Sequence, residues 1–414
     1  MDKGDTAFVL VSAALVFIMT PGLGFFYGGL GRRKNVINNI MASSSIMGLG
    51  MVMWVAVGYS LAFSGNVFGV VGSLDNFFLR RLNFEAPSDY APNLPALAFA
   101  GFQMMFALIT PAIITGAVAG RMKFKALFLF VIFWSLLVYY PLAHMVWGEG
   151  GLLGPAGLGS VDFAGGNVVH VSSGVSGLTL CLLLGKRCGY ENTLYRMHNI
   201  PFVALGAALL WFGWFGFNAG SALGANSLAA HAFMTTALAA ASGLCSWLAI
   251  DVLAKRKPSL ISLCTGVVVG LVAITPGAGF VPIWSAVLIG GSAGPVCYYG
   301  ITVIKKKLKI DDALDAFGCH GLGGIWGGLL TGVFADPNIN SLASKGLIYG
   351  GGKQFAAQVV SIVVSVVVAT VGSIICVWLV KLVTIMRVSK REELIGLDLS
   401  QHGEHAYPSF NGLD

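Results

Sequence analysis

Long apolar stretches separated by short polar loops run along almost the whole chain. A window of about twenty residues, the length that crosses a bilayer as a helix, predicts eleven transmembrane helices. We place them at 7–30, 37–63, 95–120, 124–146, 163–185, 200–221, 226–254, 259–276, 280–304, 313–334 and 355–385. The pattern therefore predicts an all-α polytopic membrane protein.

Amino-acid composition agrees with a membrane setting. Hydrophobic residues make up 56% of the 414 residues and charged residues only 10%, against about 25% in a typical soluble domain. The net charge of +7 comes from short basic clusters between the apolar stretches, where such residues set membrane orientation. Binding to nucleic acid is therefore not expected.

The seven cysteines form no recognisable ligand pattern. They lie mostly within apolar stretches, and no CxxC or Cys/His spacing is present. Buried cysteines of this kind behave as small apolar residues. We therefore predict neither a disulfide framework nor a zinc site, and we expect no metal and no cofactor.

The loops alternate between basic and neutral, acidic or mixed composition. The basic clusters are at 32–34, 121–125, 186–187, 255–257, 305–307 and in the tail from Lys381. Because cytoplasmic loops carry the excess of lysine and arginine, we expect the N-terminus outside the cell membrane and the C-terminus in the cytoplasm. The loop 64–94 is the weakest point, since it places Arg80 and Arg81 outside. The N-terminus has no basic leader, so we expect its first span to remain in the mature protein.

A weak internal repeat relates the two halves of the chain. The segment FVLVSAALVF at 8–17 resembles FVALGAALLW at 202–211, and both His170 and His320 are followed by glycine at +4 and +7. An odd number of spans in each half makes the repeat inverted, with spans 1–5 and 6–10 related and the eleventh outside it. We expect Gly174, Gly177, Gly324 and Gly327 to act as packing contacts that let the two histidine rings approach near the midplane.

Buried histidines at membrane depth are functional candidates. Desolvation disfavours the charged imidazolium, so a neutral ring that both donates and accepts hydrogen bonds is expected. A single buried histidine is more often structural. Two histidines at repeat-related positions favour a functional role for His170 and His320.

Several motifs in a fixed order resemble the ammonium transporter (Amt/Rh) family, and specifically its Amt-type members. The resemblance covers essentially the whole chain and rests on DFAGGNVVHVSSG (162–174), FGWFGFNAGSA (212–222) and FGCHGLGGIWGG (317–328). It implies a homotrimer of eleven-helix subunits, each with its own narrow pore for ammonium or ammonia. Cys319 stands where the family usually has an aliphatic residue, which we interpret as a packing variation.

The resemblance also implies an outer recruitment site for the ammonium ion. Trp147, Phe106 and Ser221 match its aromatic faces and hydroxyl, and cation–π attraction of about 0.5–2 kcal/mol per ring suits a small cation. Asp162 lies eight residues before His170, about 12 Å along a helix, and by resemblance supports this site and deprotonation. The same aspartate can also cap the fifth helix.

A gate and a pore follow below the recruitment site in the family. Phe106 and Phe217 match a stacked pair that closes the pore, and a hydrophobic constriction can gate by excluding water. His170 and His320 match the twin histidines that line the pore. Ordinary packing explains the secondary pore-lining candidates equally well; these are Phe26, Tyr27, Trp214 and Thr275.

Two polar segments lie toward the expected inner side. Asp311, Asp312 and Asp315 are expected to cap the tenth span and to pair with nearby basic residues such as Lys305–Lys307, rather than to bind a metal with His320. The tail within 386–414 carries His402 and His405 at a metal-ligand spacing, but it resembles the family's cytoplasmic tail, which helps to dock a P-II-type regulatory protein. We therefore divide the chain into a membrane domain, 1–385, and a regulatory tail, 386–414.

Energetics favour selective transport over the other functions considered. Moving a bare cation into an apolar pore costs tens of kcal/mol by a Born estimate, whereas ammonia loses far less. Ammonium can lose a proton and potassium cannot, so deprotonation at the mouth would select between them. An enzyme is not expected, because no nucleophile or metal accompanies the histidines. A passive ammonia channel and an ammonium-sensing receptor acting through partners remain alternatives, and the sequence leaves electrogenic transport open.

Overall fold

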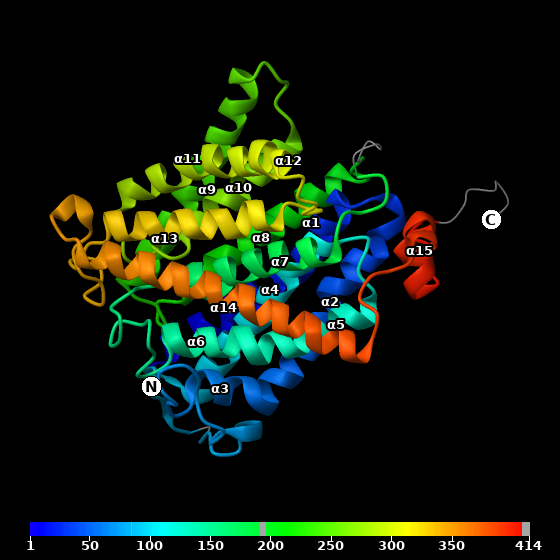
Figure 1. Cartoon of the computed structure of the whole chain (residues 1–414). Helices are drawn as coiled ribbons and strands as arrows, with labels where there is room; N and C mark the ends of the chain where they lie inside the picture. Colours follow the sequence, from blue (N-terminus) through cyan, green and yellow to red (C-terminus); the bar gives the residue numbers. More distant parts are fainter. Residues whose placement is uncertain (84, 191–195, 408–414) are drawn as a thin grey trace.

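The protein is a bundle of long helices, described by a computed structural model over residues 1–83, 85–190 and 196–407 (Figure 1). In the first half of the chain the helices are α1 (Lys3–Leu30), α2 (Val36–Met53), α3 (Tyr59–Phe63), α4 (Ala96–Val118), α5 (Phe124–Trp134), α6 (Tyr140–Trp147) and α7 (Ser172–Leu184). In the second half they are α8 (Ile200–Gly220), α9 (Ser227–Leu253), α10 (Leu260–Ile274), α11 (Ile283–Tyr299), α12 (Lys305–Lys307), α13 (Leu322–Phe334), α14 (Lys353–Val383) and α15 (Lys390–Ile395).

Short π-helical segments join or extend several of these helices. Trp54–Gly58 joins α2 to α3, Ser135–Tyr139 joins α5 to α6, and Gly300–Ile304 joins α11 to α12. Gly166–Val171 and Phe317–Gly321 lead into α7 and α13, and Asp398–His402 follows α15. Short 3₁₀ turns lie at Arg33–Asn35, Phe77–Leu79 and Leu347–Tyr349.

The predicted spans coincide with helices. Among the described residues, nine helices are long and apolar enough to cross a membrane. The two other predicted spans are helical as well, but α10 has 15 residues and α13 has 13 residues after its π-helical segment. The chain is therefore a multi-pass, mostly helical membrane protein.

Capping residues explain why several helices begin where they do. The first helix begins at Lys3 rather than at residue 7, because the side chain of Asp2 accepts the Asp5 N–H at 2.8 Å. The fifth predicted span begins at Gly166 rather than at 163. The tenth begins at Phe317 rather than at 313. In both cases an aspartate before the helix receives its first N–H groups.

The all-α prediction is wrong in one small respect. In the loop before α4, strand β1 (Pro87–Ser88) pairs antiparallel with β2 (Ala91–Pro95), with Ser88 opposite Ala91 and Pro87 opposite Pro95. Hydropathy does not reveal so short a hairpin. It lies beside α4, in the loop that also contributes Tyr90 to a cavity described below.

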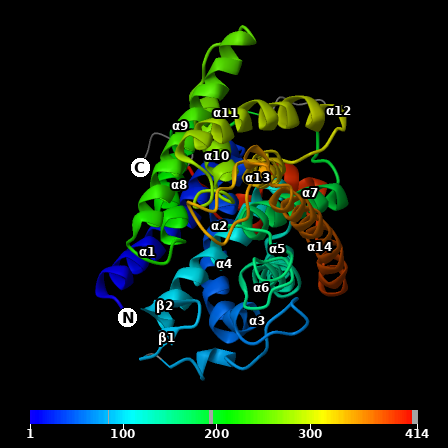
Figure 2. The ribbon, with the colours of Figure 1, turned by 90° about the vertical axis from the view of Figure 1, so that its left-hand side faces the viewer.

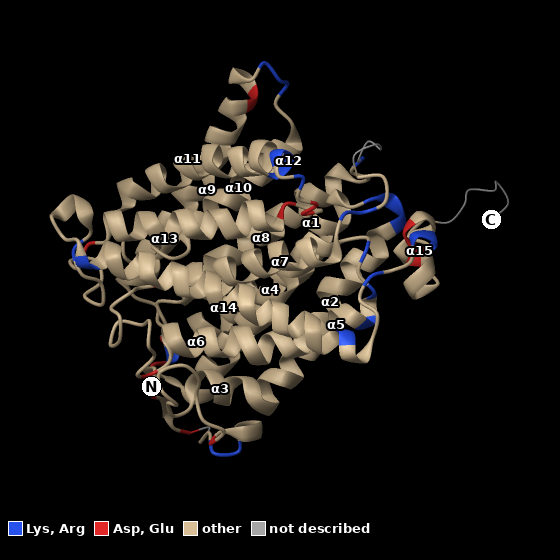
Figure 3. Cartoon of the chain, viewed as in Figure 1, with Lys and Arg blue, Asp and Glu red and all other residues tan. Residues whose placement is uncertain are grey.

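The helices surround the two π-helical segments that carry the histidines. Helix α1 packs against α8, while α9 packs against α10 and α11 (Figure 2). Helix α14 lies against α7, α13 and α5. Lysine and arginine gather mainly at the end of the bundle where α15 lies, and the helices between the two ends carry almost none (Figure 3).

Candidate functional site

A cavity of about 370 Å³ brings together all four residues predicted for recruitment. Trp147 comes from the end of α6, Phe106 from the middle of α4, Ser221 from the end of α8, and Asp162 from the segment before α7. Tyr90, Gln103, Phe163 and Asn340 are among the other lining residues. The cavity is thus mainly aromatic and apolar, with few polar groups.

Asp162 is held by backbone donors rather than by a cation. The N–H groups of residues 165–168 donate to its carboxylate at 2.6 to 3.3 Å. Burial raises the pKa of this carboxyl above its usual value of 3.8, and the N–H donors act in the opposite direction. No ion pair in the part of the chain that the structure describes includes Asp162. The carboxylate therefore caps the helix and presents negative charge beside the cavity.

Trp147 and Phe106 form one wall of the cavity. The indole N–H of Trp147 donates to the backbone oxygen of Asp162 at 2.8 Å. Its ring lies 5.9 Å from that of Phe106, nearly perpendicular at 86°. The hydroxyl of Ser221, which lines the cavity, donates to the carbonyl of Phe217 at 2.8 Å, so its oxygen can still accept a hydrogen bond. Aromatic faces, a hydroxyl oxygen and a carboxylate are groups that attract a small cation.

Phe106 and Phe217 stack against each other beneath this cavity. Their ring centroids are 4.3 Å apart with an interplanar angle of 26°, and both side chains are essentially inaccessible to solvent. Phe102 lies edge-on against Phe106 at 5.1 Å. Because the Phe217 ring also lies 6.1 Å from the ring of His170, the stacked pair lies between this cavity and the histidines.

His170 and His320 face each other, as the repeat predicts. Their Nδ1 atoms are 3.2 Å apart and the ring centroids 5.3 Å apart. For neutral rings at this distance, one Nδ1–H donates and the other Nδ1 accepts. The Nε2 atom of His170 is buried and has no hydrogen-bond partner among the described residues. A small cavity between the helices borders both rings.

Close helix packing makes this approach possible. A side chain at Gly174 would meet the backbone of Gly321 at 2.2 Å, and one at Gly324 would meet the Cβ of His170 at 3.0 Å. The π-helical segments that carry both histidines place an extra residue in the turn, and such segments are frequent at functional sites. Glycine and the wider turn together allow the two rings to meet.

The secondary candidates divide into two groups. Trp214 lines the small cavity, stacks on His170 at 5.3 Å and donates its indole N–H to Thr275 at 2.9 Å. The Tyr27 hydroxyl donates to the Ile113 carbonyl at 3.0 Å. Phe26 is buried with its ring 6.1 Å from that of Tyr27. Trp214 is therefore beside the histidines, and Thr275 supports it.

Comparison with known proteins identifies the family. A sequence profile described as the Ammonium Transporter Family matches residues 7–407. The chain is 46% identical over 408 residues to the ammonium transporter of Bacillus subtilis, covering 98% of this chain and 99% of the relative. The chain belongs to the ammonium transporter family. Proteins of this family transport rather than catalyse a reaction, so the chain is not an enzyme.

Solved structures agree with the family assignment. The crystal structure of Saccharomyces cerevisiae Mep2 has a TM-score of 0.89 and 38% sequence identity, covering 99% of this chain and 93% of Mep2. A structure titled Sensor Amt Protein has a TM-score of 0.86 and 29% identity, covering 96% of this chain and 98% of that protein.

The three aspartates before His320 have different partners. Asp315 pairs with Lys305 at 2.5 Å. Asp312 accepts the N–H groups of Ala316 and Phe317 at 3.1 and 2.8 Å and so caps the segment that carries His320. The predicted capping and the pairing with Lys305 are thus confirmed.

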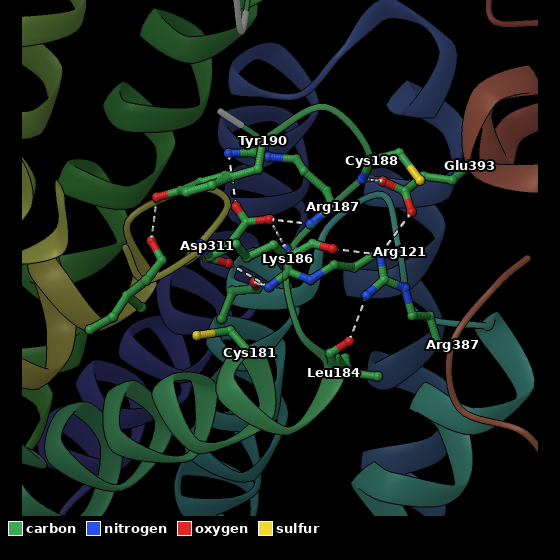
Figure 4. A network of polar contacts seen from close by, with 12 residues as sticks. Arg121, Cys181, Leu184, Lys186, Arg187, Cys188, Tyr190, Asp311, Arg387 and Glu393 are labelled. Atoms are coloured by element: carbon green, nitrogen blue, oxygen red, sulfur yellow. Dashed lines mark hydrogen bonds and ion pairs between the residues drawn. The ribbon is translucent and has the colours of Figure 1, made fainter. Parts of the chain in front are cut away.

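Asp311 has partners that the sequence interpretation did not name. Its carboxylate lies 2.9 Å from the guanidinium of Arg187 and 3.4 Å from that of Arg121, which is fully buried (Figure 4). The backbone N–H of Arg187 donates to the same carboxylate at 2.7 Å. This ion pair network connects the ends of the third, fifth and tenth predicted spans.

The tail packs against this network. Glu393 on α15 accepts the backbone N–H of Cys188 at 2.5 Å and pairs with Arg387 at 3.2 Å (Figure 4). Lys34 donates to the carbonyls of Glu393 and Leu394 at 2.8 and 2.5 Å. The carboxylate of Asp398 accepts the N–H of Asn38 near the start of α2 at 2.8 Å.

The tail histidines have separate surroundings. The Nε2 atom of His402 lies 3.0 Å from the side-chain nitrogen of Asn38, and its ring lies edge-on to Phe124 at 5.0 Å. His405 borders a groove with Arg32, Arg33 and Lys34. Residues 408–414 of the predicted tail lie outside the described residues.

Sequence reasoning missed the polar residues of α14. Gln354, Gln358 and Ser361 are buried and contact the segment that carries Asp162. Their spacing of four and three residues places them on one helix face. That stripe within an otherwise apolar span was the available signal.

Proposed function

We propose that this chain is a selective ammonium transporter of the cell membrane. Ammonium is recruited in the outer cavity by Trp147, Phe106, Ser221 and Asp162, and it loses a proton there. Ammonia then passes the stacked pair of Phe106 and Phe217 and moves along His170 and His320. The observation that carries the proposal is the succession of adjoining residues, from a cavity bordered by a carboxylate, through the stacked rings, to a buried pair of imidazoles.

Recruitment rests on the charge and faces around the outer cavity. The Asp162 carboxylate is close to the surface of the cavity and has no cation partner in the described ranges. A cation beside Trp147 and Phe106 would gain from their ring faces. The apolar surroundings strengthen these attractions because they exclude water.

The stacked phenylalanines select against charge. A bare cation between two buried aromatic rings loses its hydration, which costs tens of kcal/mol by a Born estimate. Ammonia pays much less because it is neutral. Potassium is rejected because it has no proton to lose, even though its size resembles that of ammonium.

The histidine pair supports a relay for the proton. The 3.2 Å contact between the two Nδ1 atoms is a hydrogen-bond distance, and each ring has a second nitrogen, Nε2, that does not take part in this contact. Neutral imidazoles can accept a proton on one side and release one on the other. We therefore propose electrogenic transport, in which the proton crosses through the pair.

The direct experiment is a current measurement on the purified protein in liposomes. An ammonium jump should give an inward positive current and an equal potassium jump should give none. Absence of both currents, together with a rise of internal pH after the ammonium jump, would replace the proposal with passive ammonia conduction. Absence of current and of any change in internal pH would exclude transport.

Replacing either histidine tests the relay. We expect His170→Leu and His320→Leu each to remove at least about nine-tenths of the current, because leucine cannot carry a proton. Internal pH, followed in the same liposomes, reports whether ammonia still passes. Persistence of the full ammonium current with undiminished selectivity over potassium would contradict the relay.

The architecture we propose completes the transport unit. It has eleven transmembrane helices with spans 1–5 and 6–10 as an inverted repeat, an outer N-terminus and a cytoplasmic C-terminus, and it assembles as a homotrimer. Support comes from the helical match to all the predicted spans and from the basic residues that gather near α15 (Figure 3). Cysteine labelling of introduced residues in intact cells would test the orientation, and mass measurement in detergent would test the trimer.

The segment after residue 385 is proposed to regulate the membrane domain and to help dock a P-II-type protein. Its contacts through Glu393 and Asp398 reach the loop after α7, the 3₁₀ turn after α1 and the start of α2. Deleting the residues after Arg391 removes those contacts and should lower flux or binding of the regulatory protein. Unchanged flux together with unchanged binding would contradict a regulatory tail.

A sensing role through partners is the second candidate. The structural relative titled Sensor Amt Protein is the observation that favours it. A receptor needs the outer cavity but not a conducting pore. Ammonium binding to the purified chain without flux in liposomes would favour the sensor over the transporter.

A further inference from the structure

A polar stripe on α14 fixes the segment that carries Asp162. The stripe consists of Gln354, Gln358 and Ser361, three side chains that are at most 1% exposed within a helix of otherwise mostly apolar residues. A buried amide costs free energy unless its polar atoms find partners. Gln354 and Gln358 find partners in the loop that precedes Asp162, and Gln354 also in the loop before α14. Ser361 finds its partner at the start of the helical segment that carries His170.

Gln358 makes a two-sided contact with the residue before Asp162. Its side-chain oxygen accepts the N–H of Val161 at 2.8 Å, and its side-chain nitrogen donates to the carbonyl of Val161 at 2.9 Å. The same nitrogen lies 3.4 Å from the carbonyl of Gly328 on α13. One amide therefore pairs with both polar groups of a single residue, as a neighbouring strand would, and fixes its orientation.

The other two side chains extend this anchor. Gln354 donates to the carbonyl of Gly159 at 3.2 Å and accepts the N–H of Ser344 at 2.7 Å. Ser344 follows the loop that contributes Asn340 and Leu342 to the cavity wall. Ser361 accepts the side-chain N–H of Asn167, one of the residues whose backbone N–H binds Asp162, at 2.9 Å.

We infer that Gln358, supported by Gln354 and Ser361, is a positioning residue for the outer ammonium site. It fixes Val161, so the next residue presents its carbonyl to Trp147 and its carboxylate to the helix that carries His170. The inference rests on the proposed function for the role of Asp162. It adds that the eleventh predicted span, which lies outside the internal repeat, sets the geometry of the site.

The structural alternative is that Gln358 only joins α14 to the bundle. Both roles predict some loss of stability when the amide is removed. They differ in what happens at the site, because a positioning residue controls the affinity for ammonium and a joining residue controls the amount of folded protein. The ammonium concentration for half-maximal current and the maximal current separate these two effects.

The test compares Gln358→Met with Ser373→Ala in the full-length protein. Methionine keeps the length of the side chain and removes both hydrogen bonds to Val161. Ser373 is buried on the same helix and its hydroxyl has no hydrogen-bond partner among the described residues, so its substitution controls for a change within α14. We expect Gln358→Met to raise the half-maximal ammonium concentration about tenfold or more, with a smaller change in maximal current per folded protein. Ser373→Ala should leave both within about twofold.

Hydrogen exchange gives a readout that does not depend on transport. Amides of residues 160–168 should exchange at least about tenfold faster in Gln358→Met than in the wild type, and at the wild-type rate in Ser373→Ala. Wild-type exchange at these amides, or a wild-type half-maximal concentration in the folded variant, would overturn the inference. If the wild-type protein gives no ammonium flux, the proposed function fails, while the exchange data still decide whether the stripe anchors the segment.

Milder variants keep the test decisive if Gln358→Met does not fold. Gln354→Met removes the contacts to Gly159 and Ser344, and Ser361→Ala removes only the contact to Asn167. We expect each to raise the half-maximal concentration by a few-fold, with exchange accelerated in the loop that has lost its partner. An unchanged concentration in both folded variants would overturn the inference.

Discussion

The helical segments that carry His170 and His320 each begin at a capping aspartate, but the charges around the two aspartates differ. Asp162 and Asp312 each lie eight residues before a histidine and each accept the first N–H groups of its helix. At the outer end no cation of the described residues pairs with the aspartate. At the inner end Lys305, Arg121 and Arg187 pair with the aspartates that flank Asp312.

Because of this difference, one repeated motif can attract a cation at one end of the pore and not at the other. A capped helix start needs a carboxylate at either end, so capping alone does not distinguish them. The surrounding charge does, because a carboxylate without nearby cations attracts a cation, whereas the cations that pair with Asp311 and Asp315 offset the negative charge around Asp312. We propose that ammonium is recruited at the end that carries Asp162 for this reason.

The largest expected effect is that of removing the outer charge. Asp162→Asn should lower the ammonium current at least about a hundredfold, since a charge interaction of about 3–4 kcal/mol at contact distance is lost. The same change before His320, Asp312→Asn, keeps one of the two oxygens that accept the N–H groups of Ala316 and Phe317, and should leave the current within about threefold. Liposome currents per folded protein measure both. Equal losses in the two variants would break the comparison.

Removing a cation from the inner network should act on stability instead of recruitment. Arg121→Met leaves the Asp311 carboxylate buried beside one remaining arginine, Arg187. Breaking a buried ion pair costs about 3–5 kcal/mol, so the melting temperature in detergent should fall clearly. The half-maximal ammonium concentration of the folded fraction should stay within about twofold. A shift in that concentration without a loss of stability would contradict the assignment of the two ends.

A smaller effect is expected from the outer aromatic wall. Trp147→Leu removes a ring face and the hydrogen bond to Asp162, and should raise the half-maximal ammonium concentration about 2- to 30-fold. Trp326→Leu is the matched control, because that indole also donates one hydrogen bond, to Ser292 at 2.9 Å, but lies on α13 away from the outer cavity. Titration of the current with ammonium measures both. A larger effect at Trp326 would be inconsistent with an outer aromatic site.

The smallest expected effect is a pH dependence of recruitment. Burial raises the pKa of Asp162 above 3.8, and the carboxylate is charged only above its pKa. Recruitment should therefore decline on acidification and should do so at a higher pH than for an ordinary aspartate. The half-maximal ammonium concentration, measured while the outer pH is lowered, should rise. A concentration that stays constant down to pH 3.8 would show that this charge is not used.

Hydropathy was sufficient to predict a mostly helical, multi-pass membrane protein. The apolar stretches predicted the helices of the eleven spans but not those of the tail, and the spacing around His170 and His320 predicted that the rings meet. The helix starts at Gly166 and Phe317 could not be located, because they depend on how many N–H groups an aspartate captures. The hairpin at 87–95 is too short to leave a hydropathy signal.

The sequence predicted the site residues that belong to a family motif. It missed those that depend on contacts between distant segments. Trp147, Phe106, Ser221 and Asp162 were predicted from the family resemblance, and the structure places all four around one cavity. The contacts of Gln358 with Val161 join residues 197 positions apart, and no local pattern gives such a pairing. The partners of Asp311 were missed for the same reason, since Arg121 and Arg187 lie on other spans.

The most direct test of the central claim adds a charge to the outer cavity without removing Asp162. Ser221→Lys places an ammonium group in the cavity that the aspartate borders, and Ser221→Met introduces a side chain of similar length without charge. Both variants lose the hydroxyl and fill similar volume. The account predicts that the lysine variant carries no measurable ammonium current in liposomes while the methionine variant keeps a clear part of it. Equal currents in the two variants would contradict recruitment by the outer negative charge.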